Sequence, residues 1–200
     1  MLAIVALSLS AVDPAPAQGT VTFESLLAEM ADLDTLARFP SPEYAGKQAS
    51  TYNRQSTARD QADQGTGGWF ADSDGLGFIR TEQRNGQTEW VVMEHSGPGA
   101  LTRFWTPFFY KDFGNRTGPK VRIYLDGAAT PVIDQNLIEL LTGLNWSVAE
   151  YGSKPSPQNS VSLPAPFSNF TARAGVLHFP VPFAQSCKIT LSGFGEAHRQ

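Results

Sequence analysis

Short runs in which apolar and polar residues alternate dominate the chain from residue 76 onward. In Lys120–Asp126 the odd-numbered residues are apolar, whereas the even-numbered ones, among them Arg122 and Tyr124, carry polar groups. Because successive side chains of a strand point to opposite faces, this pattern predicts one face in the core and one in solvent. The runs expected to be strands are Leu76–Glu82, Thr88–His95, Ala100–Thr106, Lys120–Asp126, Val176–Phe183 and Cys187–Leu191.

The residues Arg84–Gln87 lie between two of these runs and place Asn85 and Gly86 at their centre. Asn-Gly favours the two-residue turn that joins antiparallel strands, so a hairpin is expected here. Short strands separated by Gly, Pro and Asn, without strand and helix alternation, are typical of an all-β, mainly antiparallel protein. The sequence therefore predicts a jelly roll or β-sandwich rather than a parallel α/β sheet.

Two helices are expected beside these strands, one N-terminal and one short and internal. Thr22 can cap a helix whose apolar residues recur at helical spacing over residues 26–37, until Pro40 stops it. We expect this amphipathic helix to pack on a sheet. The internal helix is expected to begin with Asp134 as its cap and to end at Gly143.

The first residues resemble a secretory signal, because an apolar run over residues 1–9 precedes the small residues Ala15–Ala17. No Lys or Arg comes before the apolar run, which is a departure from such signals. We expect cleavage after Ala17, a secreted or periplasmic location, and a single jelly-roll domain over residues 18–200. No other apolar run is long enough to cross a bilayer.

The composition limits which classes of binding partner are expected. Hydrophobic residues make up 41% of the chain and charged residues 17%, and the net charge is -4. Without a large cluster of Lys and Arg, neither nucleic acid nor an anionic membrane is an expected partner, whereas neutral sugars remain possible. Cys187, the single cysteine, cannot form an intrachain disulfide and is expected to be a strand residue buried in the core.

No metal or cofactor is expected. Asp72–Gly75 is similar to the start of a calcium loop but lacks the distal Glu, so an ordinary turn is favoured. His95, His178 and His198 are scattered, without the spacing of a zinc site, and each is interpreted as structural.

Several carboxylates could in principle form a catalytic pair, but spacing singles out none of them. Glu82 and Glu89 flank the predicted hairpin and are expected to be solvated strand residues, while Glu94 precedes a Gly-Pro-Gly turn. The aromatic-rich segment Trp105–Phe113 has two interpretations. Burial or an interface is favoured over an exposed sugar platform, because large exposed aromatic patches are disfavoured.

A family resemblance adds to this picture. In order and spacing, several motifs resemble the domain of unknown function 2961 family, also classed as glycoside hydrolase family 172, from about Phe23 to Leu191. The motifs are Arg38–Pro40, Lys47–Arg54, Trp69–Ala71, Gly97–Ala100, Thr102–Trp105, Arg122–Gly127 and Phe179–Phe183.

This resemblance implies a double jelly roll that forms trimers or hexamers and acts on fructofuranosides or arabinofuranosides by a retaining mechanism. The chain is then expected to be the first jelly roll only, because it departs from the family at Gly193–Gln200. The family's catalytic glutamates are expected in the missing half, so no catalytic residue is assigned here. Retention needs two carboxyl groups about 5–5.5 Å apart, which the first half alone is not expected to supply.

The segment Lys47–Arg54 is the best candidate for contacting a sugar, because it combines charged, amide, hydroxyl and phenol groups with almost no aliphatic carbon. Tyr52, Trp69 and Phe70 add flat apolar faces against which a sugar ring can lie. The expected substrate-binding residues are Lys47, Gln48, Ser50, Thr51, Tyr52, Arg54, Trp69 and Phe70. The alternatives are a loop folded on itself or at a subunit contact and, for the whole chain, a non-catalytic carbohydrate-binding or structural assembly module.

Overall fold

The computed structural model describes residues 21–40, 43–52, 77–107, 119–142, 163, 166–171 and 174–193. The chain divides into two compact units, Met1–Gly46 and Lys47–Gln200. Among the described helices, none combines the length and the apolar character that crossing a membrane requires. The predicted signal sequence lies outside the described residues.

The first unit contains helix α1 (Phe23–Ala31) and the 3-10 helix η1 (Leu33–Ala37). Thr22 caps α1 as predicted: its Oγ1 accepts a hydrogen bond from the Ser25 N–H at 3.1 Å, and its own N–H donates to Ser25 Oγ at 2.9 Å. The α-helix ends earlier than predicted, because Asp32 is extended and its carboxylate accepts from the Asp34 N–H at 3.0 Å. No residue of α1 is buried, and its packing on a sheet stays a prediction.

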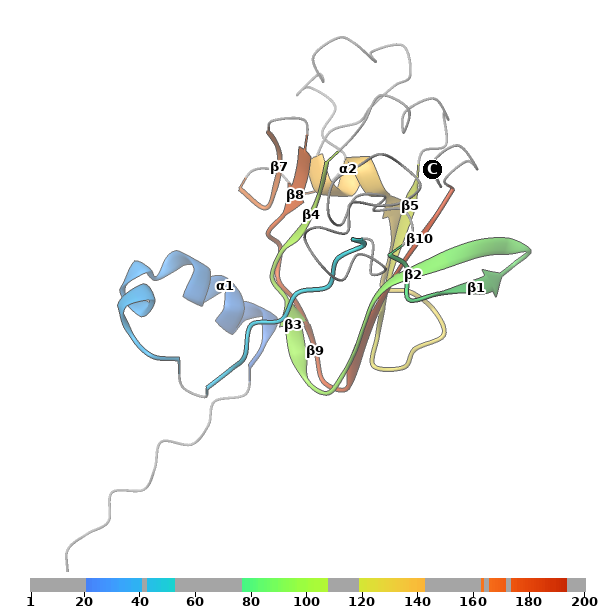
Figure 1. Ribbon diagram of the computed structural model, residues 1–200. Coiled ribbons are helices and arrows are strands. Elements are labelled where there is room, and N and C mark those ends of the chain that lie inside the picture. Colours follow the sequence, from blue (N-terminus) through green and yellow to red (C-terminus); the bar gives the residue numbers. More distant parts are fainter. Residues whose placement is uncertain are drawn as a thin grey trace, which may run out of the picture. The chain divides into compact units, whose positions relative to one another are not determined.

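The second unit is built from antiparallel strands in three sheets, which confirms the predicted fold class (Figure 1). The five-stranded sheet has the order β1-β2-β10-β5-β6, the three-stranded sheet the order β4-β8-β7, and β3 pairs with β9. The strands are β1 (Arg80–Arg84), β2 (Gln87–Ser96), β3 (Gly99–Leu101), β4 (Phe104–Pro107), β5 (Lys120–Leu125), β6 (Ile133–Asn136), β7 (Ser168–Thr171), β8 (Ala174–Leu177), β9 (Val181–Phe183) and β10 (Ser186–Ser192).

One bent ribbon connects the two larger sheets. The successive strands β2, β3 and β4 pair with β10, β9 and β8. The ribbon turns between β2 and β3, beside the turn between β9 and β10, so that in Figure 1 it forms a V with β2 and β10 in one arm and the other two strand pairs in the second arm. The ribbon is also interrupted between β3 and β4 and between β8 and β9, which breaks two of the predicted strands, Ala100–Thr106 and Val176–Phe183, in two. Pro180, which has no N–H to donate to a neighbouring strand, lies at one of these breaks.

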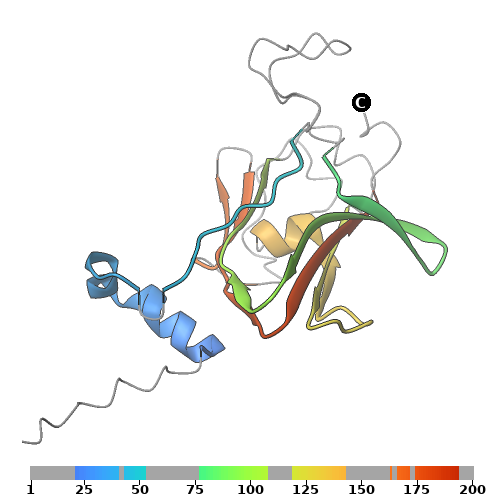
Figure 2. The same cartoon turned by 60° about the horizontal axis from the view of Figure 1, so that its bottom comes forward.

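The core fills the space between the arms of this ribbon, and helix α2 (Leu137–Thr142) packs there against β6, β7 and β8 (Figures 1 and 2). Ile123 and Cys187 are fully buried, as predicted, and burial raises the pKa of the Cys187 thiol to about 11. The buried cluster consists of Val92, Val121, Ile123, Leu137, Ile138, Leu140, Leu141, Leu177, Phe183, Cys187, Ile189 and Leu191.

The predicted cap of the internal helix is wrong by two residues. Asn136 caps α2, because its Oδ1 accepts hydrogen bonds from the N–H groups of Ile138 at 2.9 Å and Glu139 at 3.2 Å. Asp134 instead lies in β6, a strand that the sequence did not predict, where it forms an ion pair with Arg122.

Two turns fix the ends of the five-stranded sheet. Asn85 (φ 49°) and Gly86 (φ 74°) form the predicted hairpin turn between β1 and β2. After β5, Asp126 has a φ of 55°, and its Oδ1 accepts hydrogen bonds from the N–H groups of Gln185 at 2.6 Å and Ala184 at 2.9 Å. These bonds join the turn after β5 to the turn before β10 and lower the pKa of Asp126.

Candidate functional site

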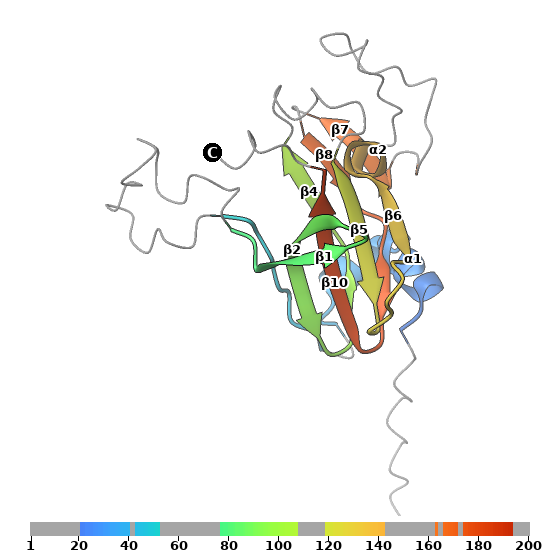
Figure 3. The same ribbon diagram turned by 90° about the vertical axis from the view of Figure 1, so that its right-hand side faces the viewer.

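The polar face of β5 is the first place where the structure departs from the sequence pattern. Arg122 and Tyr124 were expected in solvent, but they are buried, with exposed fractions of 6% and 7%. The reason is that the β1–β2 hairpin curls over the outer face of β5 and β10 (Figure 3). The hairpin also places the carboxylate of Glu89, a β2 residue, in contact with both side chains.

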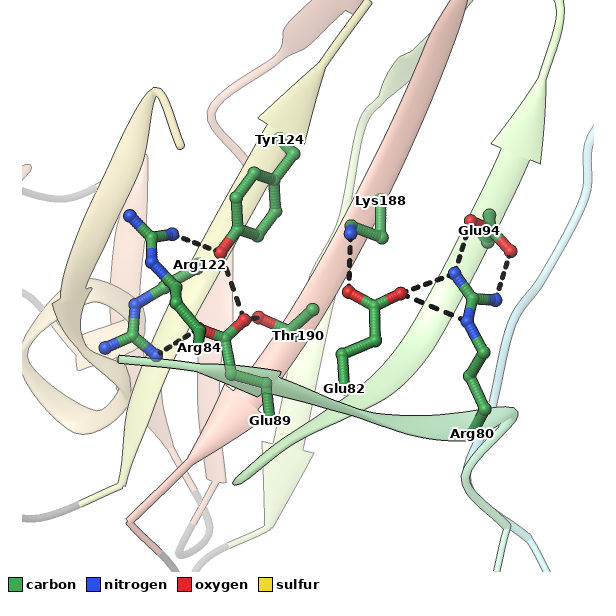
Figure 4. A network of polar contacts seen from close by, with 9 residues as sticks. All are labelled: Arg80, Glu82, Arg84, Glu89, Glu94, Arg122, Tyr124, Lys188 and Thr190. Atoms are coloured by element: carbon green, nitrogen blue, oxygen red, sulfur yellow. Dashed lines mark hydrogen bonds and ion pairs between the residues drawn. The ribbon is translucent and has the colours of Figure 1, made fainter. Parts of the chain in front are cut away.

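Glu89 is also buried, at 2% exposed, so the expectation that it is a solvated strand residue is wrong. Its Oε2 accepts hydrogen bonds from the Tyr124 hydroxyl at 3.0 Å and the Thr190 hydroxyl at 2.6 Å (Figure 4). Its Oε1 lies 3.1 Å from Arg122 Nη1, close enough for an ion pair but without the alignment of a hydrogen bond. The Arg122 charge therefore compensates the buried carboxylate.

Arg122 in turn is held from two further sides. Its Nη1 donates to Ser192 Oγ at 2.9 Å, and its Nε donates to Asp134 Oδ2 at 3.1 Å. Burial is the largest single influence on the pKa of Asp134 and raises it, but the hydrogen bond and charge of Arg122, together with the contact of Lys120, lower that pKa overall. Lys120 lies 3.5 Å from the same Asp134 carboxylate.

On the other side of Tyr124, the contacts continue to the first strand. Lys188 Nζ lies 4.7 Å from the centre of the Tyr124 ring, a cation–π contact, and donates to Glu82 Oε2 at 2.7 Å. Arg80 then bridges Glu82 and Glu94, with a 2.6 Å contact to each carboxylate (Figure 4).

Together these groups form a chain of contacts across all five strands, in which anions and cations alternate. We call it the polar ladder. Its members are Glu94, Arg80, Glu82, Lys188, Tyr124, Glu89, Arg122, Asp134 and Lys120. The ladder is buried at its centre and exposed at both ends, and it attaches the β1–β2 hairpin to the sheet.

One signal in the sequence could have revealed these partners. Once the hairpin register is fixed by Asn-Gly, Glu82 lies directly opposite Glu89. Like charges opposite each other destabilise a sheet, so each carboxylate needs a cation from a neighbouring strand. Lys188 and Arg122 supply them, although the position of β10 beside β2 cannot be derived from the hairpin.

The ladder does not resemble a glycosidase acid/base pair. A hydrogen bond from Lys188 lowers the pKa of Glu82, and one from Arg80 lowers the pKa of Glu94, so both carboxyls are held ionised. A general acid needs the opposite, a carboxyl whose pKa is raised toward the working pH. Within the ladder, the geometry fits structural support better than proton transfer.

The exposed end of the ladder predicts a dependence of stability on acid. Because the folded pKa values of Glu82 and Glu94 lie below 4.5, their stabilisation is complete above that pH and is lost as the pH falls through the folded values. We expect the thermal midpoint of Arg80→Gln to lie below that of wild type at pH 7, and the two midpoints to converge in more acidic solution. Thermal unfolding from pH 7 to pH 3 measures this, with Arg103→Gln, outside the ladder, as the control; parallel curves would contradict the assignment.

The candidate sugar-binding segment lies elsewhere, next to the start of β1. Residues 47–52 belong to no helix or strand, and none of them is buried; Tyr52 is 43% exposed. The backbone of Thr51 and Tyr52 lies against Gly77, three residues before β1. The structure thus brings Lys47, Gln48, Ser50, Thr51 and Tyr52 together on one exposed segment. Arg54, Trp69 and Phe70 lie outside the described residues.

The aromatic-rich segment is described only in part. Phe104 packs against the core, whereas Trp105 is 50% exposed and therefore not buried within this chain; an interface at Trp105 stays a prediction. His95 packs edge-on to the Phe183 ring at a centroid distance of 5.8 Å, consistent with its structural interpretation. The rest of the segment, residues 108–113, lies outside the described residues.

Comparison with known proteins places the chain in a family. The family model described as GH172 first beta-sandwich domain matches residues 42–199. The chain belongs to glycoside hydrolase family 172. The matched range includes every strand of the family 172 domain described above, together with the segment Lys47–Tyr52. No curated protein matches the chain.

Proposed function

We propose that this family 172 chain serves an exported glycoside hydrolase that acts on fructofuranosides or arabinofuranosides by a retaining mechanism. The observation that carries the proposal is the match of residues 42–199 to the first β-sandwich domain of the family. In this proposal the two catalytic glutamates come from a further β-sandwich, and this chain supplies sugar contacts and a rigid scaffold.

The polar ladder supports this division of work. A retaining enzyme needs one carboxylate as nucleophile and one carboxyl as acid/base, about 5–5.5 Å apart across the scissile bond. Glu82, Glu89 and Glu94 each contact Lys or Arg, and these contacts lower the pKa values of Glu82 and Glu94. A catalytic pair built from these three would first have to break the contacts that hold the hairpin.

The exposed segment Lys47–Tyr52 supports the sugar contacts. Its ammonium, amide and hydroxyl groups can bond the hydroxyls of a neutral sugar, and the partly exposed Tyr52 ring offers a flat face. Trimers or hexamers, which the family resemblance implies, would let such segments from several copies face one another.

A second candidate is a carbohydrate-binding or assembly module without catalysis. The observation that favours it is the same ladder, because every carboxylate it contains is in a structural contact. The two candidates differ in what a second β-sandwich adds: activity in the first case and none in the second.

The test compares this chain alone with the same chain joined to a second family 172 β-sandwich, on aryl α-arabinofuranoside and difructose substrates. We expect hydrolysis only by the longer protein, with the anomeric configuration of the product retained when followed by NMR. Hydrolysis by the chain alone would overturn the placement of the acids outside it. Sugar binding by both proteins without hydrolysis by either would establish the binding module.

A further inference from the structure

We propose that Gly77 is a positioning residue: the absence of a side chain at this point lets the backbone of Thr51 and Tyr52 lie against the start of β1 and so fixes the segment Lys47–Tyr52. The inference rests on the proposed function only for its ligand, a furanoside. The contact between the two segments stands on geometry alone.

The geometry at Gly77 leaves no space for a side chain. A Cβ atom placed on Gly77 would overlap the backbone carbonyl groups of Thr51 and Tyr52. Figures 1 and 3 both show the end of the light-blue trace beside the chain that enters β1. Because the obstructing atoms belong to backbone and not to a flexible side chain, one of the two segments must move when a methyl group is added.

The two segments that meet at Gly77 differ in how they are attached to the rest of the domain. On the β1 side, the Ile79 N–H donates to the Val91 carbonyl at 2.8 Å, and Arg80 is bound by Glu82 and Glu94 of the polar ladder. On the other side, residues 47–52 lie outside helices and strands and contain no buried residue. An added methyl group should therefore displace the segment and leave β1 in place.

A nearby glycine provides a matched control. Gly46 directly precedes the segment, and a Cβ placed on it meets nothing within 4 Å. Gly46→Ala and Gly77→Ala thus make the same chemical change on two sides of the segment. Only the second creates a clash.

The experiment measures amide hydrogen exchange over residues 47–52 and the binding of an aryl α-arabinofuranoside, in wild type and both variants. We expect Gly77→Ala to exchange faster at Thr51 and Tyr52 and to bind the sugar about tenfold more weakly, the equivalent of about one lost hydrogen bond. Gly46→Ala should match wild type in both measurements. Equal exchange in the two variants would overturn the proposal.

Two further outcomes keep the positioning role separate from the proposed function. If Gly77→Ala loosens the segment but wild type binds no furanoside, the positioning role is supported and the proposed ligand is overturned. If Gly77→Ala does not fold, the wild-type exchange decides. Slowed exchange at Thr51 and Tyr52 supports the contact, and exchange at the rate of an unstructured peptide overturns it.

Discussion

Arg122→Met is expected to lower the free energy of unfolding by about 3–5 kcal/mol, the range found when one partner of a buried ion pair is removed. The reason is the environment of Glu89, which is 2% exposed and has its Oε1 within 3.1 Å of Arg122. Without the Arg122 guanidinium, that buried carboxylate keeps, among the described cations, the looser contact of Arg84 Nε at 3.9 Å. Ser192 and Asp134 also lose a donor. Urea unfolding at pH 7 measures the loss.

The control is Lys120→Met, the same type of substitution two residues earlier in β5. Lys120 is 48% exposed and its contact to Asp134 is 3.5 Å, so its removal should cost less than about 1 kcal/mol. Combining Arg122→Met with Glu89→Gln should recover part of the loss, because the buried carboxylate charge at residue 89 is removed together with its partner. Equal effects of Arg122→Met and Lys120→Met would show that the buried centre of the ladder is not an ion pair in solution.

Ile123→Ala is expected to lower the free energy of unfolding by about 2–5 kcal/mol. Ile123 is fully buried in the middle of β5, paired with Ile189 of β10, and its side chain belongs to the cluster between the two arms of the ribbon. Truncation removes apolar contacts and leaves a cavity that the paired strands cannot easily close.

Ile79→Ala makes the same chemical change at a site that is 46% exposed and should cost less than about 1 kcal/mol. Both variants can be followed by urea unfolding with tryptophan fluorescence, since Trp90 is buried in the same sheet. A loss at Ile123 no larger than that at Ile79 would be incompatible with a core between the sheets.

The local features of the fold follow from the sequence wherever a single short-range rule applies. Thr22 begins a helix, Asn85 and Gly86 form a hairpin turn, and Val121 and Ile123 face the core. Each of these depends on neighbours within a few residues. The fold class follows from the same short strands and turns, and the family match agrees with it.

Where the structure differs from the sequence-based prediction, the cause is a contact with residues far away in the chain. Arg122 is polar and therefore looks like a solvated residue, but its environment is set by Glu89 and Ser192, which come from two other strands. Asp134 looks like a cap, but it lies in β6, where Arg122 binds its carboxylate, and Asn136 caps the helix instead. The breaks in the ribbon are also long-range features, because a bend is visible only once both paired strands are known.

The motif Arg122–Gly127, which contributed to the family resemblance, acquires a physical meaning in the structure. Arg122 compensates Glu89, Tyr124 bonds the same carboxylate, and Ile123 fills the core. Asp126 binds the turn before β10. The motif therefore describes how β5 is attached to its neighbours, and it is not evidence for a catalytic group.

For the candidate sugar site, the sequence alone allowed a prediction from the types of residue it contains, but not from their contacts. A run of polar groups with one aromatic ring suggests a ligand, and the structure adds that Lys47–Tyr52 is exposed and lies against Gly77. No rule of sequence spacing links Thr51 to Gly77, because the contact is between backbones and depends on no side chain.

The bent ribbon has a consequence for how the chain reaches its native state. The hairpin of β1 and β2 closes through a two-residue turn, whereas the pairing of β4 with β8 joins residues that are separated in the sequence by the stretch 108–173. The entropy of that closure opposes the pairing until many contacts form together, and chains dominated by such distant pairings fold slowly. During that interval the apolar faces of both arms are accessible to other chains, so conditions that prolong folding favour aggregation.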